Sequence, residues 1–160
     1  IAEHNGVRHL HHGGFHVQGE QNAGFLGIID LLVKKVAQCL FAHVHGINHR
    51  DFYICHFLLR IADGQERIDP ERLNLFVIDL HRAQIRRRTP ERWLIKDLAS
   101  LYYSSVNIGL TKQDVLRFIR RYTGRPLRQA LVDRRFWHLV KRRAIGLHVR
   151  DAGCRPNLPI

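Results

Sequence analysis

Residues 49–61, HRDFYICHFLLRI, and residues 73–79, LNLFVID, decide the fold of this chain. Each stretch contains a short apolar run, at 57–61 and at 73–78, and the segment between the runs carries the turn dipeptide Asp63-Gly64. Short apolar runs that flank such a turn are typical of paired strands. The sequence therefore predicts a two-stranded hairpin with a long tip.

Two aspartates lie at the open end of this hairpin. Asp51 comes just before the first strand and Asp79 directly after the second, so pairing of the strands brings their carboxylates together. Such a pair suits phosphoryl transfer, because one carboxylate can accept the proton of an attacking hydroxyl group while the other holds Mg²⁺ against phosphates. The alternative is that Asp51 caps a turn and Asp79 caps the segment after it.

The residues around Asp51 favour the first interpretation. His49-Arg50-Asp51 is followed by four residues and then by the polar His56, which resembles the kinase catalytic loop H-R-D-x-x-x-x-N. Residues 77–80, VIDL, stand where a kinase has a strand and the D-F-G motif. The tripeptide alone is a weak signal, and the hairpin with its second aspartate strengthens it.

The rest of the chain is predicted to be mainly helical. Apolar residues recur at the spacing of one helix face from 29 to about 46. Further helices are expected from an N-cap at Thr89 with Pro90 at the first helical position, from a capping box at 111–114 to Tyr122, and over 127–140. We therefore expect an α+β domain over 28–150. The His- and Gly-rich residues 1–27 are expected to be a loose segment, and 151–160 a tail.

The composition indicates an acidic partner. The 160 residues contain 26 Lys and Arg against 14 Asp and Glu, a net charge of +12. This charge attracts nucleic acid, anionic lipid headgroups and acidic sugars without choosing among them. The printed sequence has no run of about 20 apolar residues, which excludes an ordinary membrane-spanning helix. Its three scattered cysteines favour a reducing, intracellular compartment. The basic clusters lie at 86–88, 117–121, 134–135 and 141–143.

Longer strings match a particular family. They are residues 45–51 (HGINHRD), 53–59 (YICHFLL), 77–84 (VIDLHRAQ), 92–93 (RW), 96–102 (KDLASLY), 104–105 (SS) and 107–111 (NIGLT). On these strings, residues 29 to 125 resemble the lipopolysaccharide core heptose(I) kinase family. The resemblance implies the C-terminal lobe of a kinase-like fold that uses ATP and Mg²⁺. It also implies phosphorylation of a heptose of the lipopolysaccharide inner core at the cytoplasmic face of the inner membrane, with peripheral membrane contact and no nucleic-acid partner.

The same resemblance implies roles for residues of the hairpin. Asp51 would be the catalytic aspartate that positions the sugar hydroxyl, and Asp79 would be the metal-binding aspartate. His56 takes the place of an asparagine that binds a second metal. Because imidazole is a poor ligand for Mg²⁺, we expect His56 to donate a hydrogen bond to phosphate, the alternative being a single metal held through Asp79.

Further roles are implied outside the hairpin. Asp97 would fix the catalytic loop through the backbone of that loop, which is a structural role. The match at His81 and Arg82 implies no definite role. Arg50 and the run Arg86, Arg87 and Arg88 would face phosphates or acidic inner-core sugars, unless they form a solvated loop.

The first residues depart from the family. The printed sequence has no G-x-G-x-x-G loop and no lysine-bearing strand before the first helix, and it contains no Met. We therefore expect the chain to be an incomplete fragment that holds the C-terminal lobe only. A polypeptide of these residues alone is expected to have negligible kinase activity, because the ATP phosphates lack an anchor and a cover.

Two other functions stay open at this stage. The helix over 111–122 and the basic helix through Arg134 and Arg135 resemble a helix-turn-helix, which would make the chain a nucleic-acid-binding domain. The apolar stripes of both helices are equally explained as ordinary core. The other possibility is a catalytically inactive kinase-like scaffold, which binding of Mg²⁺-ATP would distinguish from a working enzyme.

Overall fold

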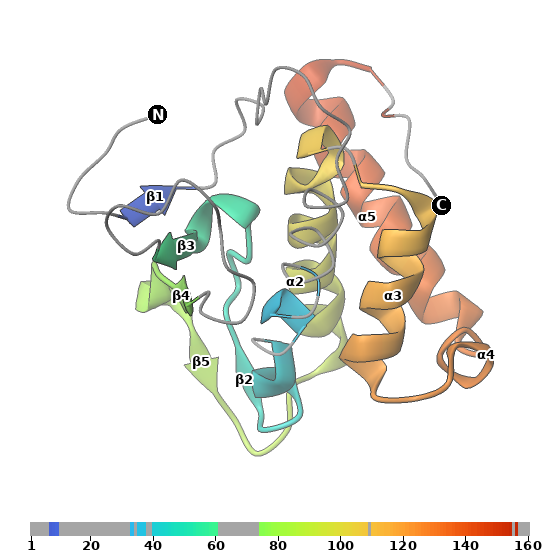
Figure 1. The fold of residues 1–160 in the computed structure, drawn as a ribbon. Helices are drawn as coiled ribbons and strands as arrows, with labels where there is room; N and C mark the ends of the chain where they lie inside the picture. The colour runs from blue at the N-terminus through green and yellow to red at the C-terminus, as the bar shows by residue number, and fades with distance from the viewer. Residues whose placement is uncertain are drawn as a thin grey trace.

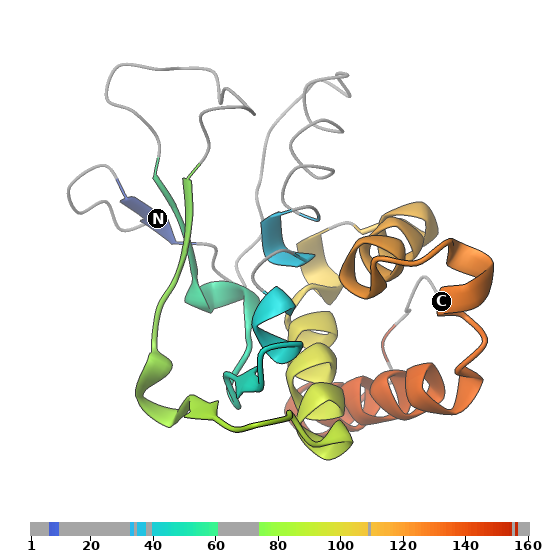
Figure 2. The same ribbon diagram turned by 90° about the horizontal axis from the view of Figure 1, so that it is seen from below.

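Helix α2 stands at the centre of the computed structural model, which describes residues 7–9, 33, 35–37, 40–60, 74–108, 110–154 and 156. Figures 1 and 2 show the strands on one side of α2 and three further helices on the other. The predicted α+β architecture is confirmed. In the described residues, the α-helices with defined bounds are α2 (Glu91–Ser104), α3 (Lys112–Thr123), α4 (Leu127–Ala130) and α5 (Arg134–Ala152).

The predicted hairpin is present. Strands β3 (Phe57–Arg60) and β4 (Asn74–Val77) pair antiparallel, with Phe57 opposite Val77. The expected tip between them lies outside the described residues. A third strand, β1 (Val7–His9), pairs antiparallel with β3. These are the only described residues of the segment 1–27, so its expected loose character is otherwise untested.

A second, two-stranded sheet was not predicted. Strands β2 (Ile47–Asn48) and β5 (Gln84–Ile85) pair antiparallel next to the hairpin. Gly46 leads into β2 with φ +79°, and a Cβ atom there would lie 1.8 Å from the Arg86 carbonyl oxygen. Only glycine tolerates both the positive φ and this close approach, so Gly46 allows the chain before β2 to lie against Arg86, which follows β5.

The first predicted helix is described only in part, and its described end differs from the expected α-helix. Residues 33 and 35–37 are helical, and the 3₁₀ helix η1 (Leu40–His43) follows. The chain then turns at 44–46 and enters β2. The described residues 33 and 35–37 agree with the predicted helix, whereas residues 40–43 form a 3₁₀ helix in place of its expected last turns.

The starts of α2 and α3 test two predicted caps. The capping box of α3 is confirmed, since Thr111 Oγ1 accepts a hydrogen bond from the Asp114 amide at 3.2 Å and Asp114 accepts one from the Thr111 amide at 2.9 Å. The cap proposed for α2 is wrong in detail. Pro90 is itself the N-cap residue, and the buried Thr89 hydroxyl donates to the His43 carbonyl at 3.0 Å.

The last predicted helix, over 127–140, is also wrong in its bounds. It is broken into α4 and α5, because Asp133 caps α5 by accepting a hydrogen bond from the Phe136 amide at 3.0 Å. Helix α5 then continues to Ala152 and ends at Gly153, which has φ +68°. The expected tail of 151–160 therefore begins with two helical residues. The separate helix α4 therefore lies in the chain between α3 and α5, the two helices that the nucleic-acid alternative would use.

The core lies between α2, α5 and the base of the hairpin. Its most deeply buried apolar residues, Phe57 and Ala99, are 0% exposed. Among the described elements, α2 makes its most extensive contact with α5. On α2, Leu98 and Leu101 are both buried in this core. No helix among the described residues has the length and apolarity needed to cross a bilayer.

The contact between α2 and α5 can be tested by titration. Tyr103 of α2 donates a hydrogen bond to Asp151 of α5 at 2.6 Å, and this bond is the main reason that the pKa of Tyr103 rises from 10.0 to about 12. Because the pKa is raised in the folded chain, the contact favours folding below pH 10 and is lost as the pH rises from 10 to about 12.

In Asp151→Asn, we expect the pKa of Tyr103 to fall toward its ordinary value. Ultraviolet titration of the phenolate measures this, with Tyr103→Phe identifying the signal. The control Asp133→Asn, at the opposite end of α5, leaves the titration unchanged. A Tyr103 pKa that stays high in Asp151→Asn would show that the hydrogen bond is not the cause.

Candidate functional site

The open end of the hairpin brings two loops together. Beyond the strands, the Ile78 amide donates to the His56 carbonyl at 2.9 Å. The His49 ring is buried, and its Nε2 donates to the Ile78 carbonyl at 3.0 Å. These bonds join the segment of residues 49–56 to the residue that precedes Asp79. The expected convergence of the two loops is therefore present.

The carboxylate of Asp51 lies between two cations. One oxygen is 2.9 Å from Arg82 Nη1, and the other is 3.4 Å from Lys96 Nζ. The Asp51 side chain is 17% exposed, so it is accessible without being fully solvated. The turn after Asp51 uses its backbone carbonyl, which accepts from the Tyr53 amide at 3.1 Å. The Asp51 carboxylate is therefore not the group that caps this turn.

Asp79 occupies the left-handed region, with φ 63° and ψ 47°, at the start of the 3₁₀ helix η4 (Leu80–Arg82). It makes no side-chain cap of that helix, contrary to the capping alternative. One of its carboxylate oxygens pairs with His81 Nδ1, and the other lies 3.4 Å from His56 Nε2. Backbone in this region costs free energy for a residue other than glycine, and such residues gather at functional sites.

His56 contacts both aspartate residues. It lies at the end of the 3₁₀ helix η2 (Ile54–His56), and its Nδ1 donates to the Asp51 backbone carbonyl at 2.7 Å while its Nε2 faces Asp79. The ring stacks on His49, with centroids 5.6 Å apart and planes 20° apart. One imidazole thus bridges the loop of Asp51 and the carboxylate of Asp79.

Asp97 on α2 is 0% exposed and holds the backbone of the 49–51 loop. One oxygen accepts from the Arg50 amide at 2.8 Å, and the other accepts from the His49 amide at 2.8 Å and from His43 Nε2 at 3.1 Å. Arg50 has φ 75°, an unfavourable conformation for arginine. The hydrogen bonds from the His49 and Arg50 backbone amides to Asp97 are those that its expected structural role requires.

The arginines expected to face the substrate lie in different surroundings. The Arg50 guanidinium lies over the ring of Trp93, 4.6 Å from its centroid, so packing and cation–π attraction hold it against α2. Arg86, Arg87 and Arg88 are exposed in the loop before α2, where the Arg86 guanidinium donates to Gln84. Arg50 therefore packs against α2, whereas Arg86, Arg87 and Arg88 are exposed to solvent in a separate loop.

Sequence reasoning missed three side chains around the aspartates: His81, Arg82 and Lys96. For His81 and Arg82 the family match was visible, but nothing indicated a contact. Lys96 lies three residues after Trp93 and next to Asp97, so helical spacing could have placed it on the face of α2 that meets the catalytic loop. Its Nζ lies 5.8 Å from the Trp93 ring.

Comparison with known proteins identifies the family of this chain. The family model described as "Lipopolysaccharide kinase (Kdo/WaaP) family" matches residues 30–122, more than half of the chain. The chain belongs to this family. Membership of the lipopolysaccharide kinase family confirms the predicted resemblance.

Two curated relatives carry the name lipopolysaccharide core heptose(I) kinase WaaP. The protein of Escherichia coli strain K12 is 52% identical over 103 residues, which are 63% of this chain and 37% of that protein. The protein of Pseudomonas aeruginosa is 55% identical over 103 residues, 64% of this chain and 37% of that protein. The chain thus spans little more than a third of the length of these lipopolysaccharide kinases.

A solved structure confirms the fold. It is titled "WaaP in complex with acyl carrier protein", and it matches with a TM-score of 0.68 and 46% identity. The match covers 77% of this chain and 51% of that one. Its sequence identity and TM-score together place the α+β domain described above in the kinase-like fold of this family.

The donor set at the hairpin fits a nucleotide-bound divalent metal. Asp79 is 38% exposed and has an oxygen directed toward the imidazole of His56. Within the described part of the chain, no three His, Cys, Asp or Glu side chains gather into a metal cage. Metals of kinase sites are commonly held by one or two carboxylates together with substrate phosphates, so the partly exposed carboxylate of Asp79 is a ligand of the right type.

Proposed function

We propose that this chain is the C-terminal lobe of a kinase that transfers a phosphoryl group from ATP to a heptose of the lipopolysaccharide inner core. The observation that carries the proposal is the hairpin end, where His56 bridges the Asp51 loop and the Asp79 carboxylate. The identity of 52% to 55% with heptose(I) kinases over the aligned residues supports the substrate class.

Each acidic residue has a task in this proposal. Asp51 orients the heptose hydroxyl and accepts its proton as the phosphoryl group is transferred. Asp79 holds Mg²⁺, which would neutralise charge on the ATP phosphates. Asp97 keeps the backbone of residues 49 and 50 in place, so that the Asp51 carboxylate is already oriented when the substrate binds.

Lys96 and Arg82 supply positive charge beside Asp51. Both cations pair with the Asp51 carboxylate without substrate, at 3.4 Å and 2.9 Å. A phosphoryl group in transfer carries negative charge on its equatorial oxygens, and cations that are already in position stabilise that charge. We propose that these two side chains contact the Asp51 carboxylate and also stabilise the negative charge of the transferred phosphoryl group.

The exposed arginines of residues 86–88 suit the acidic surroundings of such a substrate. Phosphates and carboxylates of the inner core would meet three guanidinium groups on one loop between β5 and α2. We propose that this loop faces the sugar substrate at the cytoplasmic face of the inner membrane, with the chain in peripheral contact with the anionic surface.

A segment exchange tests the proposed function. The aligned 103 residues of this chain replace the matching segment of the Pseudomonas aeruginosa kinase. We expect this hybrid kinase to phosphorylate heptose-containing core in the presence of ATP and Mg²⁺ at a rate comparable to the parent. A hybrid kinase that folds but transfers no phosphate would contradict the proposal. Calorimetry of Mg²⁺-ATP binding to the hybrid kinase tests separately whether its nucleotide site is intact.

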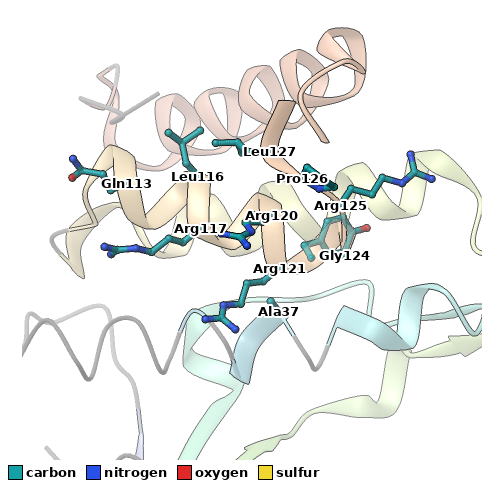
Figure 3. Close-up of a pocket in the computed structure, with 11 residues that line it drawn as sticks. Ala37, Gln113, Leu116, Arg117, Arg120, Arg121, Gly124, Arg125, Pro126 and Leu127 are labelled. Carbon is teal, nitrogen blue, oxygen red and sulfur yellow. The ribbon is translucent and has the colours of Figure 1, made fainter. Parts of the chain in front are cut away.

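We further propose acyl carrier protein as a partner, because the solved relative is titled as a complex with it. An open pocket of about 1290 Å³ beside α3 and the start of α4, here called the α3 groove, is lined by four arginines. Figure 3 shows the arginine side chains of α3 and of the turn after it, with Ala37 on the segment that lies opposite α3. A row of cations with apolar side chains between them suits an acidic protein surface. The arginines are Arg117, Arg120, Arg121 and Arg125.

Charge reversal tests this groove. Arg120→Glu with Arg121→Glu is expected to weaken binding of acyl carrier protein by at least about tenfold and to reduce its salt dependence, because two attractive charges become repulsive. Fluorescence anisotropy with the 160-residue chain measures the affinity. The control Arg134→Glu with Arg135→Glu makes the same change of net charge on exposed α5 residues. Equal losses in both double variants would contradict the assigned groove.

A further inference from the structure

We infer that Tyr122 of α3 is a positioning residue for the catalytic loop of residues 49–51. It acts on this loop through the buried side chains of His43 and Asp97. Tyr122 also lines the α3 groove, so its hydroxyl joins the wall of that groove to the backbone that carries Asp51. The task of the loop rests on the proposed function, whereas the series of contacts is tested without kinase activity.

The first contact leads from α3 to His43. The Tyr122 hydroxyl lies 3.3 Å from Nδ1 of His43, which is 79 positions away in the chain. The two rings meet edge to face, with centroids 6.0 Å apart and planes at 88°. By contrast, the neighbouring Thr123 hydroxyl donates to the Ile119 carbonyl at 2.8 Å, within α3 itself. Tyr122 thus provides a polar contact from α3 to another part of the fold.

The second contact leads from His43 to Asp97. Nε2 of His43 donates to an Asp97 oxygen at 3.1 Å, and Nδ1 faces Tyr122. Burial, with the charge of Asp97 adding to it, raises the pKa of Tyr122, so its hydroxyl keeps its proton at neutral pH. A neutral His43 ring accepts a hydrogen bond from this hydroxyl at Nδ1, and a protonated ring donates to the same oxygen. The contact therefore persists in either charge state of His43.

The third contact leads from Asp97 to the loop. The oxygen that accepts from His43 also accepts from the His49 amide at 2.8 Å. The other oxygen accepts from the Arg50 amide at 2.8 Å. Each Asp97 oxygen thus fixes a loop amide, and the donor on His43 restricts rotation of the carboxylate. Because both amides depend on this one carboxylate, a weaker contact at His43 loosens the loop.

Packing keeps the two ring side chains in place. His43 is 6% exposed, and its carbonyl accepts from the Thr89 hydroxyl at 3.0 Å. The Tyr122 ring stacks on Phe118 with planes 3° apart, and it meets Trp137 edge-on at 6.2 Å between centroids. Water therefore does not readily replace the hydrogen bond between the two rings, and its loss is felt by the groups that depend on it.

Hydrogen exchange of the 160-residue chain tests the inference. Tyr122→Phe keeps the ring and its packing and removes only the hydroxyl. We expect the His49 and Arg50 amides to exchange about fivefold faster than in the original chain, as the loss of one hydrogen bond predicts. The amide of the buried Leu101 in α2 reports general stability, and we expect its exchange rate to change by less than about twofold.

Thr123→Val is the matched control, because it removes a hydroxyl from the next residue of α3, where the bond stays within the helix. It leaves exchange at the Arg50 amide unchanged. Equal acceleration at Arg50 and Leu101 in Tyr122→Phe would mark a general loss of stability and would overturn the inference. An Arg50 amide that exchanges as in the original chain would overturn it as well.

A double variant tests the route through His43. In His43→Leu the link between Tyr122 and Asp97 is absent, so adding Tyr122→Phe causes no further acceleration at the Arg50 amide. Additive effects of the two substitutions would show that Tyr122 acts by another path. If His43→Leu does not fold, nitrogen-15 NMR of the His43 ring replaces it. Tyr122→Phe then shifts the Nδ1 signal, and an unchanged signal overturns the inference.

The hybrid kinase separates this inference from the proposed function. In a hybrid that carries at least residues 30–122, Tyr122→Phe is expected to lower the turnover number about fivefold. The Michaelis constant for ATP stays within about twofold, because Asp79 is untouched. A raised Michaelis constant with an unchanged turnover number would contradict the positioning role. An inactive hybrid kinase together with the expected exchange rates would count against the proposed function alone.

Discussion

Asp51→Asn lowers the turnover number of the hybrid kinase by about 10³-fold, which is the expected loss when a general base is removed. Asparagine keeps the size of the side chain but cannot accept the proton of the heptose hydroxyl. It also removes the negative charge that Arg82 and Lys96 contact at 2.9 Å and 3.4 Å. Since these ion pairs are partly exposed, their loss has little effect on folding.

Steady-state phosphorylation of heptose-containing core measures this effect, with thermal unfolding as the check on the fold. The control Glu91→Gln changes an exposed carboxylate at the start of α2 and leaves turnover unchanged. We expect the Michaelis constant for ATP to change far less than the turnover number, because Asp79 and the nucleotide contacts are untouched. A near-normal turnover number in Asp51→Asn would remove Asp51 from the role of base.

Asp97→Ala is expected to lower the free energy of unfolding by at least about 3 kcal/mol, since it leaves one buried and one partly buried backbone amide without an acceptor. The Asp97 side chain is 0% exposed and accepts bonds from His49, Arg50 and His43. Without it, the amide of Arg50, whose φ is 75°, loses the hydrogen-bond acceptor that fixes it. The loop that carries Asp51 should therefore relax as well.

Urea unfolding of the 160-residue chain measures the loss of stability, and hydrogen exchange at the Arg50 amide measures the loss of local order. The control Asp133→Ala removes an exposed N-cap of α5 and should cost about 1 kcal/mol, with no change in exchange at Arg50. Equal destabilisation by both variants, or an unchanged Arg50 amide in Asp97→Ala, would contradict the structural role of Asp97.

Features that depend on near neighbours could be predicted from the sequence. The hairpin follows from two apolar runs that flank a turn, and the capping box at Thr111 follows from a spacing of three residues. The meeting of the loops that carry Asp51 and Asp79 follows from the hairpin itself, because antiparallel pairing returns the chain to its starting end. Motif resemblance added Asp97, which lies 46 positions beyond the loop and would not have been found from spacing.

Boundaries were predicted less well where tertiary contacts compete with local preference. Thr89 has a good capping side chain, yet its hydroxyl is used by the His43 carbonyl. Similarly, the amphipathic stretch of 127–140 contains Asp133, whose capping bond to the Phe136 amide starts a new helix. In both places the polar side chain had several available partners, and packing chose among them.

The sequence by itself determined the hairpin, the helical order and the family, since these depend on periodicity, turn residues and motifs within short stretches. Only the tertiary structure decided which cations meet Asp51, that Arg50 packs on Trp93, and that β2 pairs with β5. It also decided that the Nδ1 of His56 is occupied by a backbone carbonyl. Such contacts join residues far apart in the chain, and their partners are fixed by the packing of whole elements, which no local pattern records.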